Sequence, residues 1–162
     1  MVKKNLISDF PAVQHDHDAC RDKAMEKAEA ICRERGERFT DLRREILELV
    51  WGTHHQVKAY DLLETISTNG RRGSPPTVYR ALDFLQSNGL VHKLESINAY
   101  VGCADPGRHH SGQFLICVQC GAVAEMDDST VSTKIAGNAK KLDFEISEQK
   151  IEVSGRCADC RA

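Results

Sequence analysis

Two pairs of cysteines carry the strongest chemical signal in this 162-residue sequence. Cys117 and Cys120 form the first CxxC pair, and Cys157 and Cys160 form the second pair after 36 intervening residues. Zinc prefers four ligands in a tetrahedron, at about 2.3 Å from each sulfur, and two CxxC turns placed side by side supply four thiolates. The spacing therefore predicts a closed zinc site that stabilises the fold and performs no catalysis.

Disulfide and redox chemistry are the alternatives for these thiols. The sequence has seven cysteines, an odd number that does not suit a disulfide framework. A thioredoxin-like redox pair needs only one CxxC at the start of a helix, whereas Gly121 and then a strand-like run follow the first pair here. Both observations favour zinc over the alternatives.

The composition, 41% hydrophobic and 28% charged, is that of an ordinary globular protein. Polar residues and Pro11 interrupt the N-terminal stretch, so it lacks the apolar core of a signal peptide. No run approaches the roughly 20 apolar residues of a membrane-spanning helix. We therefore expect a cytoplasmic protein with reduced thiols and no membrane partner.

A second group of possible metal ligands lies on both sides of the first CxxC pair: His92, Cys103, His109, His110 and Glu125. Each type has an ordinary explanation. A single histidine at a strand start is usually a surface residue, a single cysteine is usually a small buried hydrophobe, and a glutamate in an alternating strand is usually solvated. Spacing alone leaves this second site open.

Hydrophobic periodicity predicts the elements that would position these residues. In the first half of the chain, apolar residues recur at helical spacing and then alternate in two short strands around a turn at residues 96–98. The predicted helices cover residues 23–35, 41–51 with Thr40 as a cap, 59–67 and 75–88 with Ser74 as a possible cap. The predicted strands lie within residues 90–101. The last three of these helices, followed by a hairpin, are in the order of a winged helix-turn-helix.

The last of these helices has a polar side that could contact DNA. Its apolar residues share one face, which leaves the following side chains pointing away from the core: Thr77, Tyr79, Arg80 and Asp83. Arg71 and Arg72 flank its start. Arginines near a helix N-terminus suit phosphate, and an outward arginine can contact a guanine edge in the major groove. A solvated helix face explains the same pattern, so this segment alone leaves DNA binding open.

The second half of the chain differs in charge and composition. Residues 21–93 contain 13 Lys and Arg against 11 Asp and Glu, whereas residues 94–162 contain 7 against 10. Residues 103–112 are rich in Gly, Pro and polar side chains, which predicts a hinge. Beyond the hinge, strands around the first CxxC, a helix over residues 129–142 and a last strand before the second CxxC predict a small α/β unit.

The predicted fold class is therefore α+β, with an N-terminal winged helix-turn-helix domain followed by a small α/β domain that contains the four-cysteine zinc site. Four divisions are predicted: a mobile N-terminal arm (residues 1–20), a winged-helix DNA-binding domain (21–102), a hinge (103–112) and the α/β zinc-binding domain (113–162).

The sequence resembles the ferric uptake regulator superfamily from about residue 24 to residue 160, and within it the zinc uptake regulators. The resemblance rests on SPPTVYRALDFL, GLVHKLES, NAYVGC, FLICVQCGAVAE and the terminal CxxC. Members are cytoplasmic homodimers whose C-terminal α/β domain dimerises, and they bind palindromic operator DNA when loaded with metal. The resemblance implies a zinc-responsive transcriptional repressor that controls zinc uptake genes, not an enzyme.

The resemblance also implies roles for individual residues. The four CxxC cysteines match the structural zinc site of the family. The positions that form the regulatory site in zinc-sensing members are His92, Cys103, His110 and Glu125, with His109 as the alternative to His110. Three residues match positions that contact DNA in the family: Tyr60, Tyr79 and Arg80. Thr77 lies on the same helix face as Tyr79 and Arg80. The implied partners are about two zinc ions per chain, double-stranded operator DNA and a second copy of the chain, with no other small-molecule substrate.

Two departures from the family pattern bear on the metal. Iron-sensing relatives carry a His-rich run directly before the first CxxC, where this chain has HHSGQFLIC. Many members place a histidine before the last strand, where this chain has SEQKIEV with Glu148. Both absences argue against a third metal site. A cysteine in the regulatory site favours zinc, because thiolate is a soft ligand.

The resemblance implies a mechanism in which one metal ion locks the hinge. His92 belongs to the predicted DNA-binding domain, Cys103 and His110 to the hinge, and Glu125 to the C-terminal domain, so one zinc ion would join all three. Two winged helices would then be held at the spacing of successive major grooves. The alternatives are a sensor of another metal or of peroxide on the same scaffold, and a zinc-stabilised thiol enzyme. A zinc deaminase would need an HxE motif, which the sequence lacks.

Overall fold

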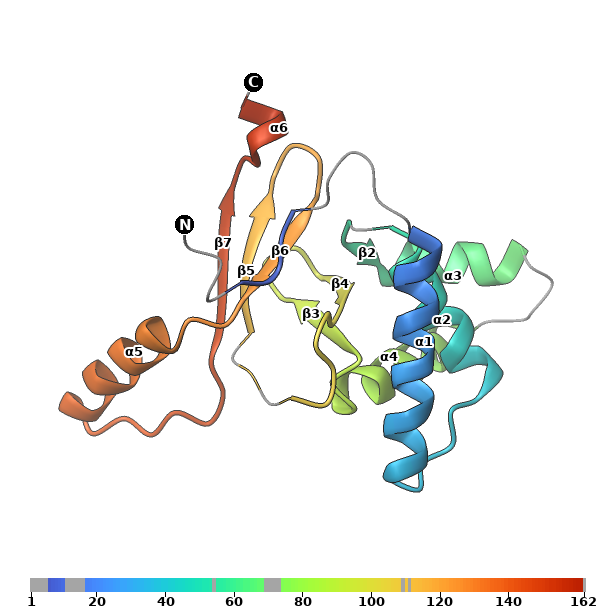
Figure 1. The fold of residues 1–162 in the computed structure, drawn as a ribbon, viewed down its shortest axis with the longest axis horizontal. Coiled ribbons are helices and arrows are strands. Elements are labelled where there is room, and N and C mark those ends of the chain that lie inside the picture. The colour runs from blue at the N-terminus through green and yellow to red at the C-terminus, as the bar shows by residue number, and fades with distance from the viewer. Residues whose placement is uncertain are drawn as a thin grey trace. The chain divides into compact units, whose positions relative to one another are not determined.

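The computed structural model of the chain describes residues 6–10, 17–53, 55–68, 74–108, 110 and 112–161. The chain divides into two compact units. The winged-helix unit spans Pro11–Arg108, and the four-stranded unit combines Met1–Phe10 with His109–Ala162. Figure 1 shows the helices and strands of both units, coloured along the chain.

Two helices open the winged-helix unit. α1 spans His17–Glu34 and α2 spans Asp41–Trp51. The start of α2 agrees with the prediction, because the Thr40 hydroxyl caps it by accepting a hydrogen bond from the backbone N–H of Arg43 at 3.5 Å. α1 begins earlier than the predicted residue 23, so the first part of the chain that was expected to be a mobile arm is helical from His17 onward.

The next two helices complete the helical part of this unit. α3 spans Ala59–Thr68 and α4 spans Pro75–Ser87. Two prolines occupy the first positions of α4, and because proline has no N–H, this helix start needs fewer hydrogen-bond acceptors. The Ser74 hydroxyl lies 2.7 Å from the Thr77 hydroxyl and caps no backbone N–H. After α4, Gly89 adopts a φ of 68°, the left-handed conformation that commonly follows a helix end.

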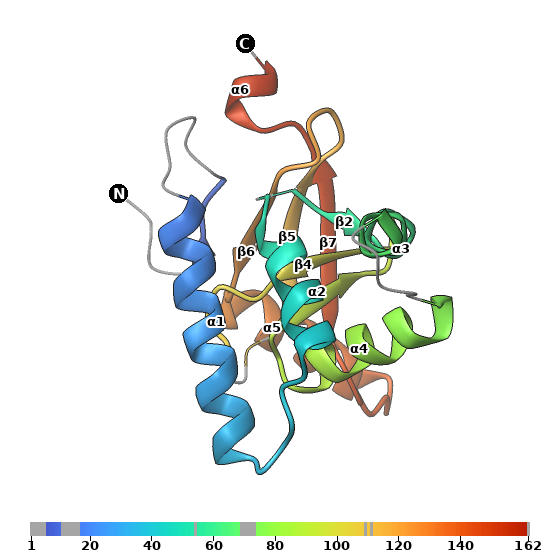
Figure 2. The same cartoon turned by 90° about the vertical axis from the view of Figure 1, so that its right-hand side faces the viewer.

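One apolar core holds the four helices together. The buried residues of α4 are those that periodicity predicted: Val78, Ala81, Leu82 and Leu85. They join a cluster with the buried face of α2, which consists of Ile46, Leu47 and Val50. Figure 2 views the same helices after a 90° rotation. Since this core fixes the rotation of α4 about its axis, the opposite face of α4 is held towards solvent.

A three-stranded sheet completes the winged-helix unit in the order β2-β4-β3. β2 spans Val57–Lys58, β3 spans Val91–Leu94 and β4 spans Ala99–Gly102, and both pairings are antiparallel. The hairpin confirms the predicted wing, whereas the two-residue β2 was not predicted. A Cβ on Gly102 would collide with the Trp51 ring, so glycine allows the wing to pack closely on α2.

A mixed sheet in the order β1-β6-β5-β7 forms the centre of the four-stranded unit. The strands are β1 (Leu6–Ser8), β5 (Gly112–Cys117), β6 (Val123–Met126) and β7 (Lys150–Gly155). β5 pairs antiparallel with β6 and parallel with β7. β1 corrects the prediction of an arm over residues 1–20, because its backbone pairs with the edge of β6, whose N–H and C=O groups would otherwise lack a strand partner.

α5, which spans Ser129–Lys141, projects from this sheet in Figure 1. The Asp128 side chain caps it by accepting a hydrogen bond from the backbone N–H of Thr130 at 2.8 Å. None of the residues of α5 is buried within the single chain. The apolar residues that the sequence places on this helix are therefore largely accessible: Val131, Ile135 and Leu142 are 37%, 39% and 80% exposed.

A buried glutamine fixes the start of α5 to the sheet. Gln113 of β5 has no exposed surface. Its side-chain amide donates to the Asp128 carbonyl and to the Ser132 hydroxyl, each at 3.0 Å, and its oxygen accepts from the Asp128 N–H at 3.1 Å. Gln149 donates to the same Ser132 hydroxyl at 3.3 Å. This network joins the start of α5 to β5 and to the segment before β7.

The short helix α6, Ala158–Arg161, ends the described chain. The predicted α+β class, with N-terminal helices and a C-terminal sheet that carries four clustered cysteines, is confirmed. None of the helices in the described part of the chain is both long and apolar enough to cross a membrane.

Candidate metal centres and DNA-binding face

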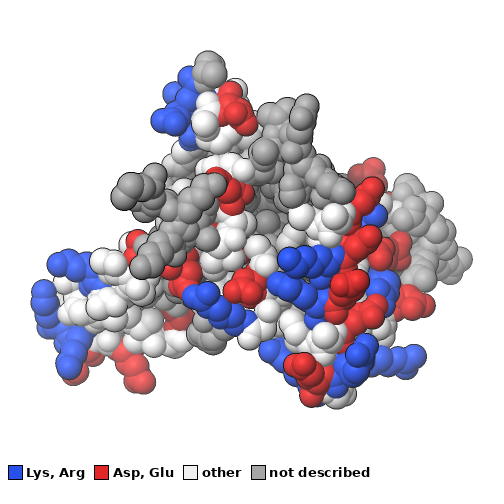
Figure 3. All heavy atoms as spheres, in the orientation of Figure 1, with Lys and Arg blue, Asp and Glu red and all other residues white. Residues whose placement is uncertain are grey.

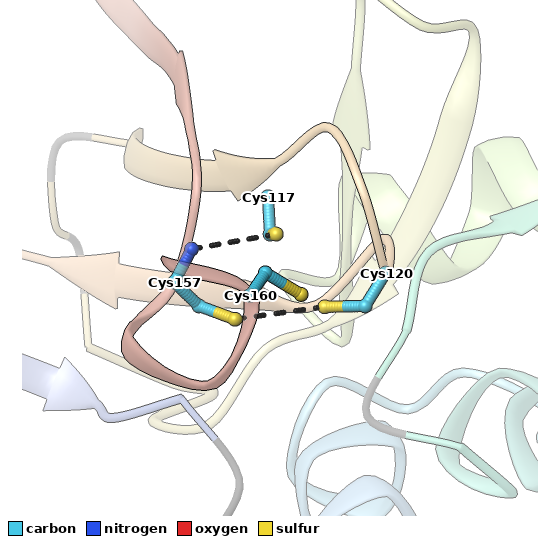
Figure 4. A group of neighbouring side chains, drawn as sticks. All are labelled: Cys117, Cys120, Cys157 and Cys160. Atoms are coloured by element: carbon cyan, nitrogen blue, oxygen red, sulfur yellow. Dashed lines mark hydrogen bonds between the residues drawn. The ribbon is translucent and has the colours of Figure 1, made fainter. Parts of the chain in front are cut away.

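The four cysteines predicted to hold zinc lie at one end of the four-stranded sheet. Cys117 ends β5, Cys120 follows in the turn to β6, Cys157 lies two residues after the end of β7, and Cys160 lies in α6. β5 and β7 are parallel, and Cys117 pairs with Gly155, so both CxxC segments leave the sheet at the same end. Figure 4 shows the four side chains converging.

The separations of the sulfur atoms fit a tetrahedral zinc ion. All four lie within 4.8 Å of one another, and the sulfurs of Cys120 and Cys157 are 3.7 Å apart. With metal–sulfur bonds of about 2.3 Å, the sulfur–sulfur edge of a tetrahedron is about 3.8 Å. A disulfide would require about 2.05 Å, and all four cysteines are free. The donor set and its geometry therefore suit zinc.

Local hydrogen bonds prepare one of the four thiols for deprotonation. The backbone N–H groups of Cys120 and Cys157 lower the pKa of the Cys117 thiol to about 5. The hydrogen bond with the Cys157 side chain, as the main cause, and desolvation by burial, as the second, raise the pKa of the Cys160 thiol to about 12. Thiolates this close repel one another, so a cation is needed before all four can ionise. The cluster thus favours the metal-bound state over four free thiolates.

Neighbouring residues support the cysteine cluster. Cys117, Ala122 and Cys157 form a small buried apolar group, and Phe10 packs against it. Gly121 adopts a φ of 77°, which a side chain would strain, and its N–H donates to the Cys117 carbonyl at 2.9 Å to close the first CxxC turn. This turn explains why glycine directly follows the first pair of cysteines.

The winged-helix unit carries one pair of further candidate ligands. His92 lies on β3, and Cys103 directly follows β4. The Cys103 N–H donates to the Leu90 carbonyl at 3.0 Å, which extends the hairpin ladder by one residue and places Cys103 opposite Leu90. Side chains alternate along a strand, so Cys103 and His92 share one face of the hairpin as diagonal neighbours. Their ligand atoms lie within 4.8 Å of each other, and Cys103 is buried.

The four-stranded unit carries a second pair. His110 precedes β5, and Glu125 lies on β6. His110 Nε2 is 2.7 Å from Glu125 Oε1, and both side chains are buried. The ordinary explanation of Glu125 as a solvated strand residue is therefore wrong. His109, the alternative ligand, lies outside the described residues.

The predicted DNA-contacting residues are accessible on the winged-helix unit. Thr77, Tyr79 and Arg80 lie on the solvent face of α4, opposite its buried residues, and Tyr60 lies in the first turn of α3. Tyr60 is 74% exposed and Tyr79 is 43% exposed, so both rings are accessible to a partner. Arg71 and Arg72 lie outside the described residues.

Charge alone does not mark a DNA-binding face in the view of Figure 3. Lys and Arg atoms are interspersed with Asp and Glu atoms over the helices α1 and α2, and further basic atoms gather at the outer end of α5. The last turn of α5 contains Lys140 and Lys141. Mixed signs agree with the net charge of −2 for the whole chain. The case for DNA binding therefore rests on α4 and its side chains.

Sequence reasoning missed three residues that support these sites. Ser8 and Phe10 fall in the segment that was predicted to be a mobile arm, and Gln113 directly follows the predicted hinge. The only sequence signal for the first two is a short apolar stretch, LIS, followed by an isolated phenylalanine. Their contacts join segments far apart in the chain, which local periodicity does not reveal.

Fold and sites together define a class of protein: a winged helix joined to a small sheet unit with clustered metal ligands. A sequence profile of the ferric uptake regulator family matches residues 34–154, and the chain belongs to this family. Proteins of this family are transcription regulators, so the protein is a regulator and not an enzyme.

Relatives in this family narrow the resemblance to zinc uptake regulators. The zinc uptake regulation protein of Escherichia coli (strain K12) is 42% identical over 138 residues, which cover 84% of this chain and 80% of that protein. A solved structure of a zinc uptake regulator complexed with zinc and DNA matches with a TM-score of 0.82 at 39% identity, covering 87% of this chain and 95% of that one. The crystal structure of holo XcZur matches with a TM-score of 0.78 at 44% identity, covering 86% and 97%. The resemblance inferred from sequence motifs is confirmed.

Proposed function

We propose that this protein is a zinc-responsive transcriptional repressor that binds palindromic operator DNA as a homodimer and controls zinc uptake genes. The observation that carries the proposal is the division of one ligand set between two units. His92 and Cys103 form a pair in the winged-helix unit, and His110 and Glu125 form a pair in the four-stranded unit. Relatives described as zinc uptake regulators support the choice of metal.

The two pairs would together hold the regulatory zinc ion. Two imidazoles, one thiolate and one carboxylate are ligands that zinc accepts in tetrahedral sites, and the thiolate favours zinc over iron and manganese. When bound, the ion supplies a cross-link between ligands that belong to different units. The chain would contribute preformed pairs, so binding has less conformational entropy to remove from the ligands themselves. Restricting the hinge would select the DNA-binding arrangement.

The four clustered cysteines would hold a second zinc ion with a structural role. They belong entirely to the four-stranded unit and lie where β5 and β7 end. A closed site of four thiolates contributes folding free energy and leaves no open position for a substrate. We therefore assign about two zinc ions to each chain, only one of which regulates.

DNA recognition would fall to α4, supported by α3. Arg80 and Tyr79 on α4 are exposed, and the buried core beneath them holds the helix rigid. A helix with outward arginine and hydroxyl side chains suits the major groove, where arginine pairs with guanine. The solved relative that contains zinc and DNA supports this role.

The exposed apolar residues at α5 support a homodimer. Leu142 and Phe144 are 80% and 65% exposed, and Val153 on β7 is 48% exposed. Burial of such a surface against a second copy is favourable by about 25 cal/mol for each Å² removed from water. Two copies would present two copies of α4, as a palindromic operator requires. We place the protein in the cytoplasm, where its thiols stay reduced.

Titration of operator affinity against buffered free zinc, at fixed salt, tests the proposal. Cys103→Ser replaces a thiolate by a poor neutral ligand, so operator binding should lose its zinc dependence and fall towards the nonspecific level. Secondary structure and one tightly held zinc ion per chain should persist. Cys20→Ser serves as the matched control, because Cys20 belongs to neither ligand set.

A Cys103→Ser protein that switches at the wild-type zinc concentration would remove Cys103 from the regulatory site. Titrations with iron and manganese in place of zinc test the alternative of a different metal sensor. Operator binding that follows iron and ignores zinc would replace the proposed zinc sensor by an iron sensor on the same scaffold.

A further inference from the structure

The N-terminal segment Leu6–Phe10, which consists of β1 and the two residues after it, contacts residues of both candidate metal centres within the four-stranded unit. Its backbone pairs with β6, with Leu6 opposite Met126 and Ser8 opposite Glu125. The Ser8 hydroxyl accepts a hydrogen bond from the backbone N–H of Glu125 at 3.0 Å. Glu125 is the β6 residue whose carboxylate lies 2.7 Å from His110. A serine near the chain start thus holds the backbone of a candidate zinc ligand.

The hydrogen bond of Ser8 lies on the outer edge of β6. The sheet order is β1-β6-β5-β7, so β1 is the strand on that side of β6 within the described residues. The N–H of Glu125 points to this edge, and the residue is 3% exposed. Without Ser8, a buried N–H would lose its acceptor, which costs more than the loss of an exposed hydrogen bond. The backbone that carries the Glu125 carboxylate would then be held less firmly.

Phe10 makes the second contact, with the cysteine cluster. Its ring packs against the buried group of Cys117, Ala122 and Cys157, with Cys160 adjacent. The Asp9 carboxylate accepts the Phe10 N–H at 2.9 Å and so restrains the backbone beside the ring. An apolar ring over a metal–thiolate cluster excludes water and competing chelators, because the shell around a site controls solvent access.

We propose that Ser8 and Phe10 are positioning residues: Ser8 holds Glu125 for the regulatory zinc ion, and Phe10 shields the four-cysteine zinc site. This inference rests on the proposed function for Ser8 and on the four-cysteine site alone for Phe10. It makes the N-terminal segment Leu6–Phe10 a determinant of the zinc affinity of one centre and of the zinc release rate of the other.

Single substitutions in the full-length protein test the two roles separately. Ser8→Ala should weaken the removable zinc about fivefold, the factor that corresponds to one ordinary hydrogen bond, and leave the tight zinc unchanged. Ser8→Thr keeps the hydroxyl and should restore the affinity. Ser154→Ala, which removes an exposed serine from the edge strand β7 of the same sheet, is the matched control.

Phe10→Ala should accelerate the removal of the tight zinc by a chelator about tenfold, with little change in the removable zinc. Phe10→Leu retains an apolar side chain and should restore slow release. Ser8→Ala should therefore change only the affinity for the removable zinc, and Phe10→Ala only the release rate of the tight zinc. A general loss of stability would not separate the two measurements in this way. Competition with a chromophoric chelator measures both zinc ions in each protein.

Amide hydrogen exchange distinguishes failure of this inference from failure of the proposed function. Ser8→Ala should raise exchange at the Glu125 amide, whether or not zinc regulates DNA binding. Faster exchange with unchanged affinity for the removable zinc would overturn the role of Ser8. Equal chelator rates for Phe10→Ala and wild type would overturn the role of Phe10. A wild-type protein that binds no removable zinc would instead refute the proposed function. The chelator experiment on Phe10→Ala would still test the role of Phe10, because it measures only the tight zinc.

Discussion

His110 Nε2 lies 2.7 Å from Glu125 Oε1, and both side chains are only 4% exposed. A buried carboxylate requires a hydrogen-bond donor or a cation, because removing its charge from water is costly. An imidazole nitrogen and a carboxylate oxygen are also ligands of zinc. The proposed regulatory zinc ion would bind to this pair, whose two side chains the fold already holds beside each other.

Replacing Glu125 should weaken the binding of one of the two zinc ions and leave the other unchanged. We expect Glu125→Ala to weaken the removable zinc by about tenfold or more, since a tetrahedral site that loses an anionic ligand loses both charge and geometry. The tight zinc should remain. Competition with a chromophoric chelator measures both, and Glu145→Ala, an exposed carboxylate of the same unit, is the control. Unchanged affinity for the removable zinc in Glu125→Ala would exclude this residue as a ligand.

Loss of one clustered cysteine should damage the whole four-stranded unit. Cys117→Ser or Cys157→Ser leaves an open site of three thiolates, and we expect loss of the tight zinc together with more than about 5 kcal/mol of folding free energy. Zinc analysis and urea unfolding followed by circular dichroism provide the measurements. Cys20→Ser should behave like wild type in both. Either cluster variant with full zinc content and normal unfolding would refute the structural role.

Arg80 should contribute to sequence-specific recognition of the operator. We expect Arg80→Ala to weaken operator binding by about 1–3 kcal/mol and to reduce the preference for operator over unrelated DNA, because a base-edge contact discriminates between bases. Fluorescence anisotropy at fixed salt and saturating zinc measures both affinities. Arg156→Ala removes an exposed arginine from the other unit and controls for the loss of one positive charge. Intact operator affinity in Arg80→Ala would mean that α4 reads DNA through other side chains.

The apolar surface at α5 should determine the oligomeric state. Leu142→Asp places a charge on a residue that is 80% exposed in the single chain, so its effect on the isolated fold should be small. If this surface pairs two copies, the buried charge should weaken the dimer by about 2–4 kcal/mol. Sedimentation velocity over a concentration series gives the dissociation constant. Tyr60→Ser, at an exposed aromatic residue of the other unit, should leave it unchanged, and a Leu142→Asp protein with the wild-type dissociation constant would exclude this interface.

Features that depend on one short stretch of chain could be predicted from the sequence. The two CxxC pairs indicated a tetrahedral thiolate site, because each turn by itself sets the spacing of two sulfurs. The apolar positions of α4 indicated its buried face, because helical periodicity repeats within a few residues. Val78 and Leu82 are fully buried, as that periodicity requires. The Thr40 cap was also visible, since a capping side chain acts on a backbone N–H only three residues away.

Contacts between distant segments were decided by the tertiary structure alone. The Ser8 hydroxyl meets the N–H of Glu125 across 117 residues of chain, and no local pattern specifies that pairing. Glu125, on the strand between β1 and β5, is buried beside His110, although a glutamate in an alternating strand is ordinarily solvated. The same holds for the parallel pairing of β5 with β7, which brings the two CxxC turns to one end of the sheet. The sequence by itself determined which side chains could bind zinc, because ligand chemistry belongs to single residues and short turns. Folding decided which of them are buried and held beside one another, because burial and proximity arise only when remote segments pack together.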